Sequence, residues 1–339
     1  MQGPLPNLPW LLGPDTRRLL SQAGPLIYWR YLFTLGAVSA FCHPVGASRW
    51  WIKRLKLIGR STFRRIAVQT WLGAVASCGL LRRVVAARPA VLERPFRPLA
   101  RFGVDFDERM RIVLEHYRIM HAKLPAAVCE RIYLSAGLEW HVPGAGYALR
   151  LADSGPNPKE GELAFYWIDK AHGACLAQLS FYLTQGKHGT EVFIGGLQGP
   201  SGGSSRDWIR EATRACDGLR PKDAVMEALL ALAATLGVTR VVAVSRINHV
   251  GRQRRTPRAI LADYESFWTE AGGRELPCGN MEVPVAQPRR DVMSLPSKKR
   301  SAYRRKLQRQ EAIEALVRGW LGGPKVAVHG DSEQAVAIA

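Results

Sequence analysis

The fold is decided by residues 191–245, which read EVFIGGLQGPSGGSSRDWIREATRACDGLRPKDAVMEALLALAATLGVTRVVAVS. An apolar strand leads through glycines and serines into two helices, which end at Gly218 and Gly237. The closing run VTRVVAVS is dense in valine, as expected of a strand buried on both faces. Because a strand, a helical connection and a second strand form a right-handed crossover, the sequence predicts two parallel strands with the helices on one face.

Upstream of this crossover, apolar and polar residues alternate with the period of two that is typical of strands. The predicted strands are Tyr147–Ala152, Leu163–Asp169, Ala174–Thr184 and Glu191–Leu197. The segments DKAHG and QGKHG supply short hairpin turns between them, so we expect a meander of antiparallel neighbours.

Helices and short strands are predicted on both sides of the meander and the crossover in the sequence. A helix is predicted over residues 107–125, with Asp107 as its cap, and another over 258–271. One or two strands are expected within residues 274–285, followed by a basic helix from Lys298 to Gly319. The predicted fold class is therefore α+β or α/β: a mixed, mostly antiparallel sheet with a splayed parallel pair, preceded by a basic helical region.

Three regions are expected along the chain. Residues 1–100 form a basic, mainly helical N-terminal region, and residues 105–310 form the α/β domain. The stretch 88–103 contains three prolines and is predicted to be a linker between them. Residues 320–339 are predicted to be a disordered tail.

The charge of the chain requires an anionic partner. The 339 residues carry a formal net charge of +20, with a hydrophobic content of 47% that suits an ordinary globular protein rather than a disordered one. Residues 1–100 contain 15 Lys and Arg against only Asp15 and Glu93. Nucleic acid, lipid headgroups, lipopolysaccharide and phosphorylated ligands all have the complementary charge.

The compartment is predicted from the cysteines and the apolar stretches. Six scattered cysteines without metal-ligand spacing suit a reducing cytoplasm, with neither a disulfide framework nor a zinc site, and no secretory signal is expected. Residues 31–42 and 66–81 are apolar but too short to span a bilayer. They are either core helices or interfacial helices on an anionic leaflet, which leaves peripheral association with the inner membrane open. Trp50 and Trp51 lie among cations, as at a membrane interface.

The glycine-rich loop at residues 198–205 has two interpretations. A strand that parts from its parallel neighbour leaves a crevice in which open α/β sheets bind ligands, and the next helix start favours an anion. A flexible connector, or close packing around the strand glycines Gly195 and Gly196, explains the composition equally well. Since no P-loop lysine follows, nucleotide hydrolysis is disfavoured.

Polar residues also follow the valine-rich strand. Ser245 and Asn248 are candidate substrate-binding residues, and His249 is a candidate acid or base, with Glu191 at the entry to the preceding strand as the other catalytic candidate. A capped turn and a structural histidine are the alternative. No G-x-S-x-G elbow surrounds any serine, which argues against a hydrolase triad.

The basic helix near the C-terminus is a second candidate anion site. Its predicted anion-binding residues are Lys298, Lys299, Arg300, Arg304 and Arg305. A solvated helix face is the alternative interpretation. The single aromatic among these cations is Tyr303, and no helix-turn-helix pattern is present, so nucleic-acid binding is less favoured than contact with phosphate or lipid headgroups.

Four separated blocks resemble the VirK-like family of bacterial proteins. They are FIGGLQG, the run from REATRACDGLRPKDAVM to VTRVVAVS, YESFWTEAGG and SLPSKKRSAYRRK, within roughly residues 107–309. The resemblance implies a Gram-negative source and a role in virulence or stress tolerance, including resistance to cationic antimicrobial peptides. It implies no reaction.

A looser resemblance is to the GCN5-related N-acetyltransferases. The order of meander, diverging strand, loop, helix and splayed strand is similar, so the resemblance implies an acyltransferase-like sheet, and Gln198 matches the Q of the family's Q-x-x-G-x-G loop. Ser201 replaces the middle glycine, an extra helix is present, and Trp268 stands where the family's tyrosine protonates the leaving thiolate.

This second resemblance implies acyl-CoA as the ligand, with the pyrophosphate held by the loop and by Arg206 or Arg210. The implied cofactor-binding residues are Gln198, Gly199, Gly202, Gly203, Ser204 and Arg206. The chain is then an acyl-CoA-dependent acyltransferase or a degenerate relative of one. The alternative is a non-catalytic binder of anionic membrane lipid or nucleic acid, including a role in the response to DNA damage. The oligomeric state stays open.

Overall fold

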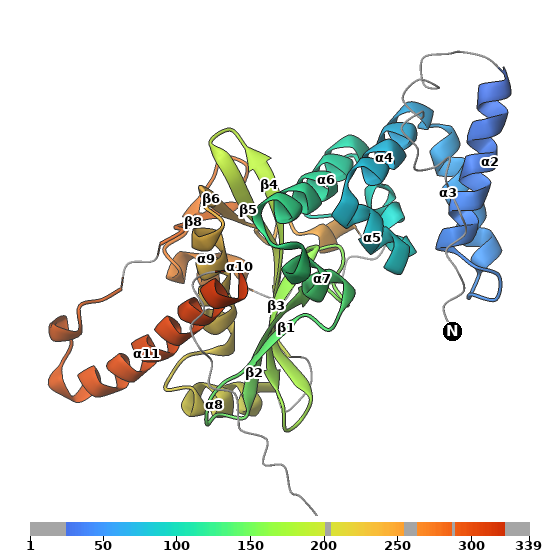
Figure 1. The fold of residues 1–339 in the computed structure, drawn as a ribbon. Coiled ribbons are helices and arrows are strands. Elements are labelled where there is room, and N and C mark those ends of the chain that lie inside the picture. Colours follow the sequence, from blue (N-terminus) through green and yellow to red (C-terminus); the bar gives the residue numbers. More distant parts are fainter. Residues whose placement is uncertain (1–24, 201–204, 254–262, 287–288, 323–339) are drawn as a thin grey trace, which may run out of the picture.

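The centre of the molecule is an eight-stranded sheet with the strand order β1-β2-β3-β4-β5-β6-β8-β7 (Figure 1). The structure is a computed structural model that describes residues 25–200, 205–253, 263–286 and 289–322. Every strand pair is antiparallel except β5 and β6, which are parallel. The predicted class, a mostly antiparallel mixed sheet with one parallel pair, is confirmed.

The meander occupies one side of the sheet. Its strands are β1 (Leu138–His141), β2 (Tyr147–Asp153), β3 (Leu163–Asp169), β4 (Ala174–Gly186) and β5 (Gly189–Gln198). Gly173 and Gly189 have positive φ angles of 62° and 130°, which is why the two predicted hairpin turns contain glycine. The strand β1 was not predicted, because its four residues contain only two apolar side chains, too few to establish an alternating pattern.

The crossover follows β5. It contains α8 (Ser205–Ala215) and α9 (Pro221–Thr235) and returns through β6 (Arg240–Ala243). After β6 the chain forms α10 (Tyr264–Glu270), β7 (Arg274–Glu275), β8 (Met281–Val283) and α11 (Ser297–Trp320), with short 3-10 turns η2 (Val250–Gln253) and η3 (Val292–Ser294). The predicted return strands and basic helix are confirmed.

Helices cover both faces of the sheet. On one face, α6 (Phe106–Lys123) packs on β4, beside α7 (Ala126–Leu134); on the other, α9 packs on β3 and β4 and carries α11 (Figure 1). The cap of α6 is Asp105, whose Oδ1 accepts a hydrogen bond of 2.8 Å from Glu108 N. The predicted cap, Asp107, lies instead inside the first turn, because the helix begins at Phe106, two residues before a helix capped by Asp107 would begin.

The basic N-terminal residues form a helical extension. It comprises α2 (Pro25–Cys42), α3 (Trp50–Thr62), α4 (Arg65–Ser77), α5 (Gly79–Ala87) and the 3-10 helix η1 (Pro89–Phe96) (Figure 1). The prediction of a linker over 88–103 is wrong, because η1 buries Val91 and Leu92 against α5 and α6. One cluster of buried residues runs from Tyr31 to Leu321. The division into 1–100 and 105–310 stays a prediction, and residues 323–339 lie outside the described part.

In the described ranges, none of the helices combines the length and the apolar character that crossing a bilayer requires.

Candidate functional site

The parallel strands β5 and β6 part halfway along β5. They pair from Glu191 with Arg240 to Ile194 with Ala243, and the last bond joins Val244 N to Ile194 O at 2.9 Å. Beyond this point β5 continues only along β4, as far as Gln198. The predicted divergence beside the glycine-rich loop is therefore present, and residues from three other segments enter it.

Gly195 and Gly196 make room for one of these segments, the connection between β2 and β3. A Cβ atom on Gly195 would lie 2.1 Å from the carbonyl oxygen of Glu160, and one on Gly196 would lie 2.0 Å from Glu160 Oε2. Gly195 is also the extra residue of a bulge, since Ser180 pairs with Gly196 and Phe181 with Ile194. These two glycines serve the close approach of Glu160, which is one of the alternatives that the sequence leaves open.

Four polar side chains meet where the strands part: Glu160, Gln198, His249 and Tyr264. Gln198 Nε2 donates to both Glu160 carboxylate oxygens, at 3.0 and 3.1 Å. His249 Nε2 lies 3.4 Å from Glu160 Oε1 and 3.5 Å from the Tyr264 hydroxyl. Glu160, His249 and Tyr264 are buried, and the imidazole stacks on the phenol at a ring distance of 5.4 Å. We call these four residues the divergence cluster.

The hydrogen bonds of the divergence cluster define the histidine tautomer. His249 Nδ1 accepts a hydrogen bond of 3.0 Å from Gly251 N, so in the neutral imidazole the proton is on Nε2 and faces Glu160. Burial, together with the Glu160 carboxylate, raises the pKa of Tyr264 above its ordinary value, against the lowering effect of the Leu197 backbone and of Gln198. The phenol is therefore protonated at neutral pH, as an unperturbed tyrosine is, and is a weaker acid than one in water.

Two of the cluster members, Gln198 and His249, were predicted as site residues, and two were not. Tyr264 lies one helical turn before Trp268, so both face the divergence from α10. Trp268 is fully buried and donates from Nε1 to Val244 O at 2.9 Å, which is a packing role. The motif YESFWTEAGG does carry a hydroxyl to the site, but four residues earlier than the family comparison places it.

Glu191 is not part of this cluster. It lies at the start of β5, seven residues before Gln198, and a strand rises about 3.3 Å per residue. Its Oε1 is 3.9 Å from Arg240 Nη1 across the parallel pair. The structure thus separates the two predicted catalytic residues, Glu191 and His249, and it is the carboxylate of Glu160 that faces the histidine.

The two predicted substrate-binding residues, Ser245 and Asn248, lie in different environments. Asn248 Nδ2 donates to Asn280 Oδ1 at 3.0 Å and to Cys278 O at 2.8 Å, and these bonds join the turn after β6 to the approach of β8. Ser245 N lies 3.4 Å from the same Asn280 oxygen. The Ser245 hydroxyl is buried and has no hydrogen-bond partner in the described residues. Asn248 is therefore engaged in holding the turn, whereas Ser245 retains an unused hydroxyl.

A surface pocket of about 340 Å³ adjoins the divergence cluster at Gln198. Its lining residues are Asn157, Ala174, Cys175, Gln178, Gln198, Gly199, Pro200 and Trp208. Arg206 is exposed on the first turn of α8, which also carries Trp208. The predicted loop residues Gly202, Gly203 and Ser204 lie outside the described residues. Gln198 is thus shared between a pocket and a buried set of titratable groups.

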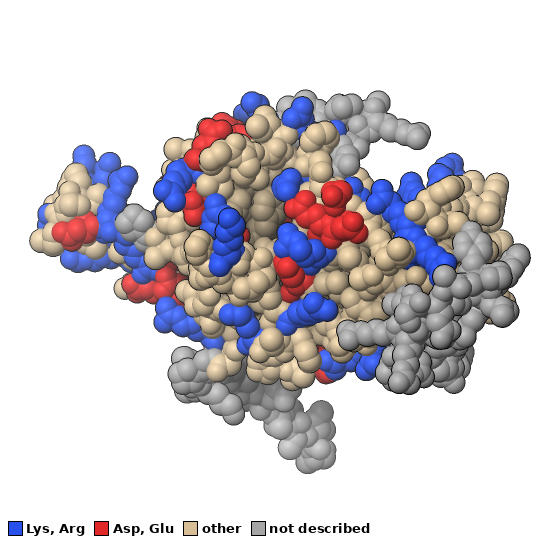
Figure 2. Space-filling model, turned by 90° about the horizontal axis from the view of Figure 1, so that it is seen from above, with Lys and Arg blue, Asp and Glu red and all other residues tan. Residues whose placement is uncertain are grey.

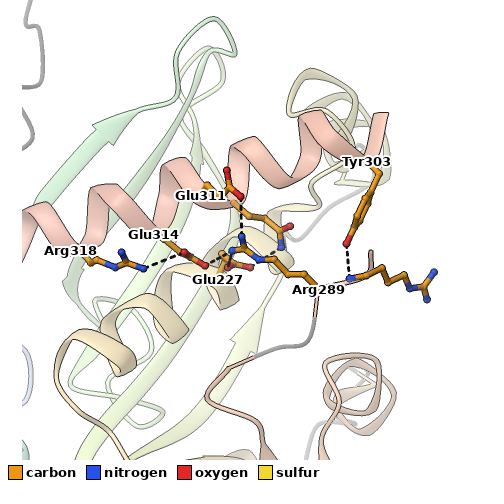
Figure 3. Close-up of polar contacts among 8 residues, drawn as sticks. Glu227, Arg289, Tyr303, Glu311, Glu314 and Arg318 are labelled. Atoms are coloured by element: carbon orange, nitrogen blue, oxygen red, sulfur yellow. Dashed lines mark hydrogen bonds and ion pairs between the residues drawn. The ribbon is translucent and has the colours of Figure 1, made fainter. Parts of the chain in front are cut away.

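The basic helix α11 packs on the rest of the protein mainly through its C-terminal half, where Ile313 and Val317 are buried. Arg289 lies among Glu227 of α9 and Glu311 and Glu314 of α11, with its nitrogens 3.3 Å from Glu227 Oε1 and 3.3 Å from Glu311 Oε1 and a further bond to Glu314 (Figure 3). Burial and the neighbouring Glu314 raise the pKa of Glu227. A groove of about 580 Å³ runs beside these side chains and reaches Tyr303.

The five predicted anion-binding residues lie in the projecting half of α11. Arg300 donates to Leu295 O at 2.9 Å and Arg305 to Asp217 Oδ1 at 3.2 Å, so both are used within the molecule. Lys298, Lys299 and Arg304 are exposed and form no ion pair with the residues that the structure describes. In Figure 2, blue side chains gather on this projection and on the opposite end, where the N-terminal helices lie.

Comparison with known proteins gives a family and relatives without an assigned function. The profile of a family described as "Protein of unknown function (DUF535)" matches residues 46–318. The uncharacterized protein YbjX of Escherichia coli K12 is 28% identical over 284 residues, which cover 80% of this chain and 84% of YbjX. An uncharacterized protein of Haemophilus influenzae is 26% identical over 176 residues, 52% of this chain and 58% of its own.

A shorter match is to the membrane protein LapB of Mannheimia haemolytica, 32% identical over 93 residues, 27% of this chain and 40% of LapB. No solved structure matches the chain. The VirK-like resemblance is confirmed at the level of the DUF535 and YbjX family. The resemblance to GCN5-related N-acetyltransferases rests only on the order of the strands and the positions of the motifs.

Proposed function

The chain belongs to the DUF535 family of proteins of unknown function, and we propose that it binds an acyl-CoA beside Gln198 and transfers the acyl group to an acceptor. The observation that carries this proposal is the divergence of β5 from β6, with a buried carboxylate, imidazole and phenol in the gap and a pocket at its end. Ligands of open α/β sheets bind where neighbouring strands part. The net charge of +20 suits a ligand that carries phosphates.

The proposed reaction is attack of an acceptor amine or hydroxyl on the thioester carbonyl. The acceptor forms the new bond to the acyl carbon and loses a proton, while the C–S bond breaks and the thiolate leaving group gains one. Tyr264 is proposed to give the thiolate its proton, because its hydroxyl lies where the strands part, 3.4 Å from Gln198 Nε2 and 3.5 Å from His249 Nε2. Glu160 and His249 are proposed as positioning residues, since they hold Gln198 and stack on the phenol.

The ligand's phosphates are proposed to meet the loop after Gln198 and the guanidinium of Arg206. Arg206 is exposed at the start of α8, and cations and free backbone N–H groups at such a position favour an anion. Gly199 tolerates close approach, since a Cβ there would touch only Lys222 Cε, at 3.8 Å. Acyl-CoA satisfies both halves of the proposed site, with its acyl thioester at the divergence cluster and its pyrophosphate at the loop.

Calorimetric titration with acetyl-CoA and longer acyl-CoAs tests the binding, and release of the free thiol tests the transfer. Arg206→Ala is expected to weaken binding about tenfold, as loss of one charge-assisted contact to phosphate does. Arg118→Ala, which removes an exposed arginine of α6, is the matched control. Tyr264→Phe is expected to leave binding within about twofold and to lower turnover about 100-fold or more. A folded protein that binds no acyl-CoA at millimolar concentration would remove the proposal.

The cellular role proposed for this activity is tolerance of stress, including exposure to cationic antimicrobial peptides. The support is the VirK-like resemblance, which implies such a role. Deletion of the gene in its source bacterium is expected to increase killing by cationic peptides, and the wild-type gene is expected to restore survival. If the Tyr264→Phe gene restores survival fully, the role does not depend on the proposed chemistry; if deletion has no effect, the role itself is wrong.

A further inference from the structure

The helix α3 has an apolar face that points away from the molecule. Trp51 and Leu55 lie one turn apart on this helix and are 56% and 62% exposed. Leu57, which is 6% exposed, marks the side that packs within the N-terminal extension, where α3 contacts α2 and α4. At about 100° per residue, Leu55 lies about 160° and Trp51 about 120° around the helix axis from Leu57. These two large side chains therefore face solvent.

More apolar side chains are exposed in the same N-terminal helices and the loops between them. Phe63 and Ile66, at the junction of α3 and α4, are 92% and 80% exposed, and Phe33 and Val45 are 78% and 72% exposed. Of the ten large apolar side chains that are exposed in the described residues, six belong to residues 33–66. Exposed apolar residues of this density mark an interaction surface rather than ordinary surface variation.

Cations accompany this surface and carboxylates do not. Residues 25–92 contain 11 Lys and Arg and no Asp or Glu. Lys53, Lys56 and Arg60 follow each other at spacings of three and four residues, so they form one exposed stripe along α3. At about 100° per residue this stripe lies about 100–180° around the helix axis from Trp51 and Leu55, on the other flank of the exposed side of α3. Arg54 is used within the molecule, since its Nε donates to His43 O at 2.8 Å and its guanidinium lies over the Trp50 ring.

We propose that α3 and its junction with α4 dock this protein on an anionic lipid bilayer, with Trp51 and Leu55 in the headgroup region and the lysine stripe against lipid phosphates. The combination of tryptophan, aliphatic side chains and cations is that of an interfacial helix. A helix of 13 residues is too short to span the bilayer and lies along its surface. The phosphates of a nucleic acid would pair with the cations, but they would not bury the exposed leucine and isoleucine side chains, whereas a bilayer does both.

The docking face, which we define as the exposed side of α3 with Phe63 and Ile66 at its junction with α4, is held in place by the rest of the N-terminal extension. The Tyr31 hydroxyl of α2 donates to Ser61 O of α3 at 2.7 Å, and Leu57 and Ser61 are buried. In Figure 2 this end of the molecule shows blue and tan atoms without red ones, apart from what grey atoms cover. The docking face is thus preformed, and the proposal does not depend on the acyl-CoA site.

Flotation of the full-length protein with vesicles tests the proposal. Vesicles of phosphatidylcholine alone are compared with vesicles containing roughly one-third phosphatidylglycerol, at about 0.1 M and about 1 M salt. We expect binding to the anionic vesicles at low salt and its loss at high salt. Lys53→Gln/Lys56→Gln is expected to lower the partition coefficient about 25-fold, since each cation near such a surface contributes about fivefold. Trp51→Ala/Leu55→Ala is expected to lower it at least about tenfold.

Matched variants on other surfaces distinguish vesicle binding by the α3 face from non-specific binding by any exposed apolar or cationic side chain. Ile247→Ala/Met293→Ala removes two side chains that are 54% and 61% exposed, and Arg118→Gln/Lys187→Gln removes two exposed cations, one of α6 and one in the turn between β4 and β5. Both are expected to bind vesicles within about twofold of wild type. Absence of flotation, equal binding to neutral vesicles, or a loss as large in the matched variants would overturn the proposal. So would binding of duplex DNA that falls in Lys53→Gln/Lys56→Gln without any vesicle binding.

Discussion

Glu162→Gln is expected to lower the free energy of unfolding by about 3–5 kcal/mol, the usual cost of leaving one partner of a buried ion pair alone. Glu162 is 2% exposed, and its Oε1 lies 2.8 Å from Arg94 Nε. Its Oε2 accepts a hydrogen bond of 2.8 Å from the Tyr117 hydroxyl. Burial lowers the pKa of Arg94, but the Glu162 carboxylate outweighs this effect and the pKa is raised. Without that carboxylate, a guanidinium stays charged in an apolar site.

This pair joins the N-terminal extension to the sheet, because Arg94 belongs to η1 and Glu162 directly precedes β3. Urea unfolding at neutral pH measures the change. Glu130→Gln is the matched control: it breaks the pair of Arg83 and Glu130, whose side chains are 40% and 47% exposed, and is expected to cost at most about 1 kcal/mol. Equal losses in the two variants would show that Glu162 and Arg94 are not the buried link that the geometry describes.

Removing both charges of the buried pair is expected to cost less than removing one. In Arg94→Met/Glu162→Leu, neither a guanidinium nor a carboxylate is left unpaired, and apolar replacements of buried pairs are often nearly neutral. The Tyr117 hydroxyl then loses its acceptor, which costs about 1–3 kcal/mol when the group stays buried. The double variant therefore separates the cost of an isolated charge from the cost of lost packing.

The sequence predicted the sheet well because its signals are local. Alternating strands, glycines at the two hairpin turns and a valine-rich strand after two helices each restrict a few neighbouring residues, and together they define the meander and the crossover. The parting of β5 from β6 could also be predicted, since Gly195 and Gly196 interrupt an otherwise apolar strand. What the glycines accommodate could not be, because Glu160 approaches from a connection 35 residues earlier in the chain.

Glu160 and the 3-10 helix η1 were misjudged for the same physical reason. Glu160 stands in the polar, proline- and glycine-containing run NPKEGE, which is typical of an exposed loop. The prolines near η1 are likewise typical of a linker, yet Val91 and Leu92 are buried there. In both segments the local composition favours solvent, and only tertiary contacts with distant elements bury the side chains. Tyr264 is the first residue of the motif YESFWTEAGG, but only the helix α10 shows that it lies on the same face as Trp268 and reaches the divergence.

His116 is expected to make the stability of the protein depend on pH below neutrality. The ring lies between α6 and the sheet. Its Nδ1 accepts a hydrogen bond of 3.1 Å from Leu183 N, and its Nε2 lies 2.6 Å from the Tyr133 hydroxyl. Burial lowers the pKa of His116 from 6.5 to about 3. A proton on Nδ1 would face the Leu183 N–H group, so the folded protein holds the imidazole neutral.

The direction of the effect follows from proton uptake. Between about pH 6.5 and pH 3 the unfolded chain binds a proton at His116 and the folded protein does not, so acid favours unfolding. The stabilisation is complete above about pH 6.5 and falls by about 1.4 kcal/mol for each pH unit below it. Urea unfolding at about pH 7.5 and about pH 5 therefore should show a loss of about 2 kcal/mol from this residue alone.

His116→Gln separates this titration from the other groups that respond to acid. Glutamine cannot be protonated, so the variant is expected to be less stable than wild type at neutral pH, by about 1–3 kcal/mol for the disturbed buried hydrogen bonds, and to lose about 2 kcal/mol less on acidification. His188→Gln, which removes an exposed histidine in the turn between β4 and β5, is the control for the loss of a histidine. If acid destabilises His116→Gln as much as it destabilises wild type, the neutral buried imidazole is not what links folding to pH.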